Sequence, residues 1–168
     1  MIGGVAASLV GKPRATQDID GVIWLADERG LDELLESGRS CGFEPRIPDV
    51  VPFARANRVL LLIHRPSGVG IDLSLAVLPF ERQMLDHATS VHLGEGFALP
   101  VPAPADLVVM KIIARRPKDI ADIEHVLEAN PDVDRAHVRR WVKQFAEVLE
   151  SPEILDDLER IFKRVPAE

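Results

Sequence analysis

Three prolines, Pro100, Pro102 and Pro104, divide the sequence into two stretches with different hydrophobic patterns. Before them, short apolar runs rich in β-branched residues alternate with amphipathic segments, which is typical of strands and helices in turn. After them, apolar residues recur only at helical spacing. A chain that mixes strands and helices and then continues with helices alone belongs to the α+β class. We therefore expect a mixed core over residues 1–99 and a helical region over 100–168.

The spacing of apolar residues and the turn residues between them predict individual elements. Gly3-Gly4 suits a tight turn that opens a helix. Further along, two apolar strand patterns are separated by only a few residues around the turn Pro66-Ser67-Gly68, and this short connection predicts an antiparallel hairpin. The predicted strands are 18–25, 59–64 and 70–76, with one or two short ones within 91–99. The predicted helices are 2–10, 31–41, 105–116, 118–129, 134–149 and 152–165.

Composition excludes several classes of protein. The chain has 168 residues, of which 46% are hydrophobic and 28% charged, as in ordinary globular domains. The only cysteine, Cys41, excludes an internal disulfide and a multi-cysteine zinc site. The net charge of −7 argues against a general nucleic-acid coat. No apolar run is long enough to span a membrane, and no basic segment precedes the apolar N-terminus as in a signal peptide, so we expect a cytoplasmic protein.

Three aspartates carry the most specific chemistry. Asp18 and Asp20 lie two apart at the start of a predicted strand, so both carboxylates leave the same face. Asp72 lies inside an apolar strand, where an isolated charge is costly. If the two strands pair, three carboxylates surround one or two metal ions, and such a site holds the attacking and leaving oxygens of a phosphoryl transfer. The alternative for Asp72 is an ion pair with Arg58 or Arg65.

Candidate phosphate-binding features lie upstream of the first two aspartates in the sequence. Gly3-Gly4 brings bare backbone N–H groups to the start of a helix, where an anion is favoured. Lys12 and Arg14 lie in the loop that leads to Asp18 and could neutralise phosphate charge.

Two segments together resemble a known family. The first is Ile2-Gly3-Gly4-Val5-Ala6 followed by Gly11-Lys12-Pro13-Arg14-Ala15-Thr16-Gln17-Asp18-Ile19-Asp20. The second runs from Asp106 to Asp122 and contains Lys111, Arg115 and the pair Lys118-Asp119. This pattern resembles the nucleotidyltransferase superfamily, and most of all its AbiEii-type branch, many of whose members are toxins of bacterial toxin–antitoxin pairs. The resemblance covers 2–25, 70–76 and 104–125 and implies a polymerase-β-like mixed sheet with flanking helices.

The resemblance also implies an activity and its residues. It implies a Mg²⁺-dependent enzyme, with Mn²⁺ as a second suitable ion, that moves a nucleotidyl group from an NTP to a hydroxyl while pyrophosphate leaves. Asp18, Asp20 and Asp72 would bind the metal, and Asp72 could instead act as a base toward the acceptor. The residues implied to bind the nucleotide are Gly3, Gly4, Arg14, Thr16 and Lys111. The implied partners are an acceptor such as tRNA, another RNA, a protein or a small molecule, a cognate antitoxin, and a second copy in a homodimer.

The sequence also departs from the family pattern. Many relatives have Gly-Ser in place of Gly3-Gly4, although the AbiEii-type branch tolerates two glycines. The printed sequence begins at this motif, whereas relatives usually carry a helix and a short segment before it. This departure motivates a second hypothesis, a catalytically degenerate member that binds a nucleotide or a protein. A third hypothesis is an aminoglycoside-type adenylyltransferase, which differs only in its acceptor.

Several charged residues of the second stretch have structural alternatives. Lys111 could extend along a helix flank, and Asp119 and Asp122 could simply favour the first turn of their helix. Basic residues interleaved with acids suit either an RNA-binding face or a solvated surface. These residues are Arg115, Arg116, Lys118, Arg135, Arg139, Arg140 and Lys143.

Overall fold

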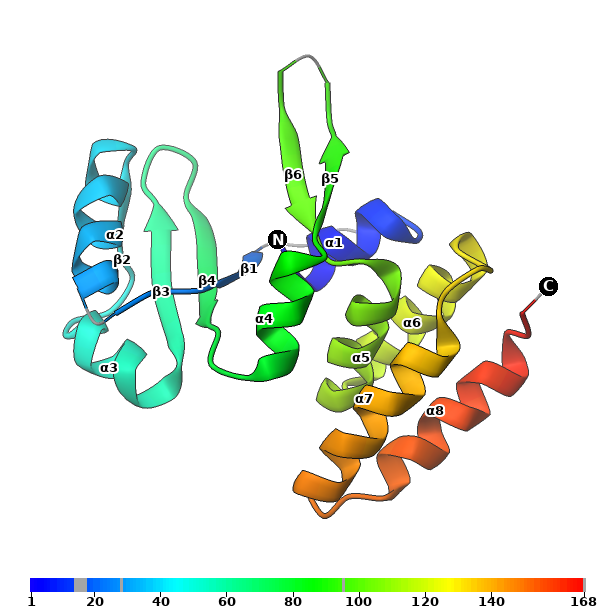
Figure 1. Ribbon diagram of the computed structural model, residues 1–168. Helices are drawn as coiled ribbons and strands as arrows, with labels where there is room; N and C mark the ends of the chain where they lie inside the picture. Colours follow the sequence, from blue (N-terminus) through cyan, green and yellow to red (C-terminus); the bar gives the residue numbers. More distant parts are fainter. Residues whose placement is uncertain (14–17, 28, 95, 168) are drawn as a thin grey trace. The chain divides into compact units, whose positions relative to one another are not determined.

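A computed structural model describes residues 1–13, 18–27, 29–94 and 96–167 (Figure 1). The contacts of the chain divide it into two compact units, Met1–Val5 with Ala15–Asp86 and Ala6–Arg14 with His87–Glu168. This division falls between Asp86 and His87 rather than at the three prolines, and it groups residues 6–14 with the C-terminal part. The domain boundary between 99 and 100 stays a prediction.

A four-stranded mixed sheet forms the centre of the first unit. Its strands β1 (Ile19–Ile23), β2 (Phe43–Pro45), β3 (Val59–His64) and β4 (Val69–Leu75) lie in the order β1-β4-β3-β2. The pair β1–β4 is parallel, and the pairs β4–β3 and β3–β2 are antiparallel. The predicted hairpin of β3 and β4 is thus confirmed, and the strand that carries Asp72 lies beside the strand that carries Asp20.

The two faces of this sheet differ because β4 alternates apolar and polar residues. The helices α2 (Arg29–Ser40) and α3 (Val50–Asn57) pack on the apolar face. The residues of this core are Leu31, Leu35, Val50, Ala54, Leu60, Leu62 and Leu75, with Ile23, Ile71 and Leu73 packed against them. The intervening residues Gly70, Asp72 and Ser74 leave the opposite face. The sequence pattern of one strand therefore decides which face carries the acids.

Three elements of the first unit were not predicted from the sequence. They are β2, α3 and α4 (Pro79–Asp86). β2 has only 3 residues, too few for a periodic pattern. α3 is bounded by Asp49 and Arg58, both in the left-handed conformation that favours glycine, so the usual boundary signals are absent. The helix α1 (Gly3–Val10) was predicted, and its residues are divided between the two units.

The second unit is helical apart from one hairpin. The strands β5 (Thr89–His92) and β6 (Ala98–Val101) pair antiparallel, which confirms that short strands lie in this region, although they extend two residues beyond the expected 91–99 at each end. The helices α5 (Pro104–Ala114), α6 (Pro117–Ala129), α7 (Arg135–Val148) and α8 (Glu153–Arg164) confirm the four predicted helices, and their ends differ from the predicted ones by at most two residues. α5 contacts each of the other three helices and is buried on most sides, as its nearly uniform apolar sequence requires.

Candidate active site

Three aspartates of the first unit lie on the sheet face opposite α2 and α3. The parallel register pairs Asp20 of β1 directly with Asp72 of β4, so both side chains leave the same face. Asp18 precedes β1, and its Oδ1 lies 2.8 Å from the point where a Cβ on Gly70 would be. The pairing expected for the two strands is therefore present, and it brings the backbones of all three acids to one part of the sheet.

The start of α1 contacts the same acids. The backbone N–H of Ile2 donates to the carbonyl of Asp20 over 2.8 Å. Gly3 has a positive φ of 66°, and a Cβ on it would lie 1.9 Å from Oδ2 of Asp20. Only a glycine permits this approach, because any side chain would overlap the carboxylate. Gly4 follows in the first turn of the helix. Both glycines thus open a helix, as the sequence predicted, and the structure places this helix start beside Asp20.

Arg46 is a site residue that the sequence did not reveal. Its Nη2 donates to Oδ1 of Asp72 over 2.6 Å, and its Nη1 lies 2.8 Å from the Cβ position of Gly70. The alternative that an arginine pairs with Asp72 is thus present in the structure, but the arginine is Arg46 and neither of the two named as examples; Arg65 pairs with Glu44. Arg46 lies 26 residues from Asp72 in the sequence, so only the β2–β3–β4 pairing brings them together.

Two predicted nucleotide-binding residues, Arg14 and Thr16, lie outside the described residues. Lys12, from the same loop, is described and forms an exposed ion pair with Glu128 at 2.5 Å.

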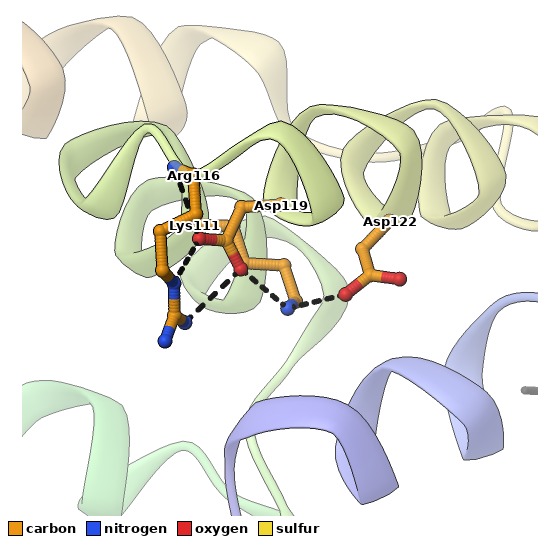
Figure 2. Close-up of polar contacts among 4 residues, drawn as sticks. All are labelled: Lys111, Arg116, Asp119 and Asp122. Atoms are coloured by element: carbon orange, nitrogen blue, oxygen red, sulfur yellow. Dashed lines mark hydrogen bonds and ion pairs between the residues drawn. The ribbon is translucent and has the colours of Figure 1, made fainter. Parts of the chain in front are cut away.

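Lys111 of the second unit lies in a buried network (Figure 2). Its Nζ donates to Oδ2 of Asp122 over 2.7 Å and to Oδ1 of Asp119 over 3.2 Å. Arg116 binds the same Asp119 through Nε at 2.6 Å and through Nη2 at 3.1 Å. Two cations thus face two carboxylates, and the network is neutral as a whole. The ammonium is tied to these carboxylates, and its predicted contact with a triphosphate stays a prediction.

Asp119 also begins helix α6. Its Oδ2 accepts the backbone N–H of Arg116, which caps the helix, as expected for an acid in the first turn. Burial by itself raises the pKa of Asp119, but the bonds from Arg116 and Lys111 outweigh burial and hold the pKa below its ordinary value. Asp119 therefore stays ionised although its side chain is fully buried.

Most of the basic residues expected on an RNA-binding or solvated face have acidic or carbonyl partners. Arg115 binds Glu153 and Asp157, and Arg139 binds Glu159 through two bonds. Arg135 donates to the carbonyls of Phe162 and Val165. These contacts join α5 and α7 to α8 and its C-terminal end, so they account for the charges structurally.

The aspartates suit a divalent ion by chemical type, because Mg²⁺ prefers carboxylate oxygens. In the side-chain positions observed, however, no three His, Cys, Asp or Glu residues among those described are gathered closely enough to hold a metal. One oxygen of Asp72 is bound to Arg46 instead. The Mg²⁺ and Mn²⁺ predictions stay predictions.

The fold is similar to that of a solved nucleotidyltransferase-like protein. This solved structure is an antigenic nucleotidyltransferase-like protein from Paracoccidioides brasiliensis. The similar region covers 94% of the present chain and 82% of the chain of that protein. The TM-score is 0.50 and the sequence identity 19%, so this similarity concerns the fold. No curated protein sequence matches the chain.

The family follows from the sequence as a whole. A family model described as "Nucleotidyl transferase AbiEii toxin, Type IV TA system" matches residues 1–168. The chain therefore belongs to the AbiEii nucleotidyltransferase toxin family, which confirms the resemblance drawn from its motifs. Among the described residues, no helix is long and apolar enough to cross a membrane.

Proposed function

We propose that this protein is a Mg²⁺-dependent nucleotidyltransferase that moves an NMP group from an NTP to an acceptor hydroxyl. The acceptor oxygen forms a bond to the α-phosphorus, the bond from that phosphorus to the β-phosphate oxygen breaks, and pyrophosphate leaves. The observation that carries the proposal is the register of β1 and β4, which sets Asp20 beside Asp72 on the face that Asp18 shares.

Each part of the site has a distinct task in this reaction. Asp18 and Asp20 would hold the divalent ion, and Asp72 would either bind the same ion or accept the proton of the acceptor hydroxyl. Bound Mg²⁺ supplies charge that stabilises the developing negative charge on the phosphates. Gly3 and Gly4 present backbone N–H groups at the start of α1 beside Asp20, where phosphate oxygens are favoured.

Thermal unfolding with each NTP, with and without Mg²⁺, tests the proposal. A ligand at 100 times its Kd stabilises the folded state by about 2.7 kcal/mol. We expect a Mg²⁺-dependent rise that disappears in Asp18→Asn/Asp20→Asn, because that variant lacks two metal ligands. The matched control is Asp32→Asn/Asp86→Asn, which removes two exposed acids of the same unit. A rise of equal size in the Asp18/Asp20 variant contradicts the carboxylate mechanism.

Acceptor and biological role form the second part of the proposal. Radioactive label at the α-phosphate of the NTP should transfer to RNA, with tRNA as the first acceptor to test, or to protein. Expression in bacteria should stop growth for the wild type and not for Asp18→Asn/Asp20→Asn, and a cognate antitoxin should restore growth. Since NTPs and tRNA are cytoplasmic, we place the reaction in the bacterial cytoplasm. Sedimentation of the pure protein tests the proposed homodimer.

A catalytically degenerate binding module is the second candidate. Its specific support is the Arg46–Asp72 ion pair, which occupies one of the implied metal ligands. Such a protein would bind NTP without Mg²⁺ and would transfer no label to any acceptor. NTP binding that depends on Mg²⁺ and on Asp18 and Asp20 excludes this candidate.

A further inference from the structure

Arg46 is held beside the acids by its backbone as well as its side chain. Its N–H donates to the carbonyl of Leu61 over 3.0 Å, which fixes the residue after β2 against β3. Leu61 is the register partner of Asp72, so the Arg46 side chain crosses β3 to reach the carboxylate on β4. The sheet thus places a cation at the acids, even though the arginine follows a strand of only 3 residues.

Gly70 provides the space that this arginine occupies. Nη1 of Arg46 and Oδ1 of Asp18 each lie 2.8 Å from the position of a Cβ on Gly70. A side chain at this position would push both groups away. The guanidinium therefore lies against the same small area of the sheet as Asp18 while it binds Asp72.

We propose that Arg46 is a phosphate-binding and positioning residue of this site. The proposal rests on the proposed nucleotidyl transfer. Arg46 holds Asp72 through their 2.6 Å ion pair. When the metal and nucleotide bind, Asp72 turns to the ion, and the guanidinium binds oxygens of the triphosphate.

The strength of the ion pair suits such an exchange. The side chains of Arg46 and Asp72 are 34% and 35% exposed, so solvent screens their attraction and ligands reach both. A divalent cation attracts Asp72 more strongly than a single guanidinium does. The planar guanidinium can donate to two phosphate oxygens at once, which favours a change of its partner from Asp72 to a triphosphate.

Binding of Mn²⁺ alone and of inorganic triphosphate with Mn²⁺, both measured by titration calorimetry, tests the role of Arg46. In Arg46→Gln we expect Mn²⁺ alone to bind more tightly, by up to about tenfold, because a competing positive charge is gone. Triphosphate with Mn²⁺ should bind roughly tenfold to a hundredfold more weakly, because a charge-assisted contact is lost. Arg46→Lys keeps the charge without the planar fork and should recover triphosphate binding in part.

Arg65→Gln is the matched control, since Arg65 forms a comparable exposed ion pair with Glu44 in the same unit. It should change neither affinity by more than about twofold. Circular dichroism and the melting temperature verify that each variant is folded. Opposite changes of the two affinities in Arg46→Gln support the proposal, because a structural defect would weaken both.

The other outcomes separate the failure of this inference from that of the function. If the wild type binds both probes and Arg46→Gln leaves either affinity unchanged or weakens both, the role of Arg46 is overturned and the proposed function stands. If the wild type binds neither probe, or if Asp18→Asn/Asp20→Asn binds Mn²⁺ as the wild type does, the proposed function fails and the role of Arg46 fails with it.

Discussion

Replacing Lys111 by methionine should destabilise the second unit strongly. The Lys111 side chain is only 4% exposed, and its ammonium binds Asp119 and Asp122, which are 0% and 4% exposed. Methionine has a similar length and no charge, so the change removes the cation with little effect on packing. It takes one of the two cations of this network away from the two buried carboxylates.

The size of the effect follows from this burial. Removing one partner of a buried ion pair costs about 3–5 kcal/mol. Asp119 keeps its bonds to Arg116, so we expect the lower end of the range, about 3 kcal/mol. In a chain of this length each kcal/mol lowers the melting temperature by about 2–4 °C, which gives a decrease of roughly 6–12 °C.

Urea unfolding measures this change for the second unit. The chain has 2 tryptophans, Trp24 in the first unit and Trp141 in the second. In a Trp24→Phe background, fluorescence reports Trp141 of α7. Lys143→Met, which removes an exposed lysine from the same helix, is the control and should change stability by less than about 0.5 kcal/mol.

The pH dependence gives a second, independent test. The pKa of Asp119 is lower in the folded protein than in the unfolded chain. The ionised carboxylate therefore stabilises the fold at pH values above the unfolded pKa of about 4. This stabilisation is lost as the pH falls through the folded pKa. Lys111→Met removes one of the groups that lower this pKa. The stability difference from the wild type should therefore be full at pH 7 and become smaller below about pH 4.

A cost below about 1 kcal/mol, or one equal to that of Lys143→Met, would refute the reasoning that this network holds α5 to α6. The double variant Lys111→Met/Asp122→Leu provides a further check. Replacing a buried pair by apolar residues is often close to neutral, so the double variant should be more stable than Lys111→Met alone.

Two further predictions concern single contacts. Gly3→Ala would place its Cβ 1.9 Å from Asp20, so it should abolish Mg²⁺-dependent NTP stabilisation in the thermal assay. The control is Gly68→Ala, because Gly68 has a similar φ and a Cβ there would meet nothing within 4 Å. This control should cost only the backbone strain of about 1 kcal/mol and leave NTP binding intact. His137→Ala removes the 2.7 Å bond to the buried Asp106 and should cost about 1–3 kcal/mol in urea unfolding, whereas His92→Ala, at an exposed position, should not.

The sequence predicted the fold class and most elements because their signals are local. The alternation of β4 marks it as a strand with one apolar face, and it also shows that Asp72 leaves the other face. The four C-terminal helices have apolar residues at helical spacing and end near prolines or asparagine. The short β2, and α3 with its left-handed boundary residues, carry no such local signal.

The residues of the candidate site also differ in whether a local sequence signal reveals them. The motif residues Gly3, Asp18 and Asp20 could be named from the sequence because they lie in the motif that resembles the family. The partner of Asp72 could not, since several arginines lie within 26 residues of it in the sequence, and the nearest of them, Arg65, pairs with Glu44. Only the order of β2, β3 and β4 selects Arg46.

Lys111 shows the same dependence on tertiary structure. Its helical position was clear from the sequence, but the direction of its side chain was not. The left-handed Arg115 ends α5, and α6 begins at Pro117, so the chain reverses and brings Asp119 and Asp122 to the ammonium. Local periodicity thus determines which segments are helices and strands, whereas the long-range pairing of charges depends on how those segments pack, because opposite charges must meet when they leave water.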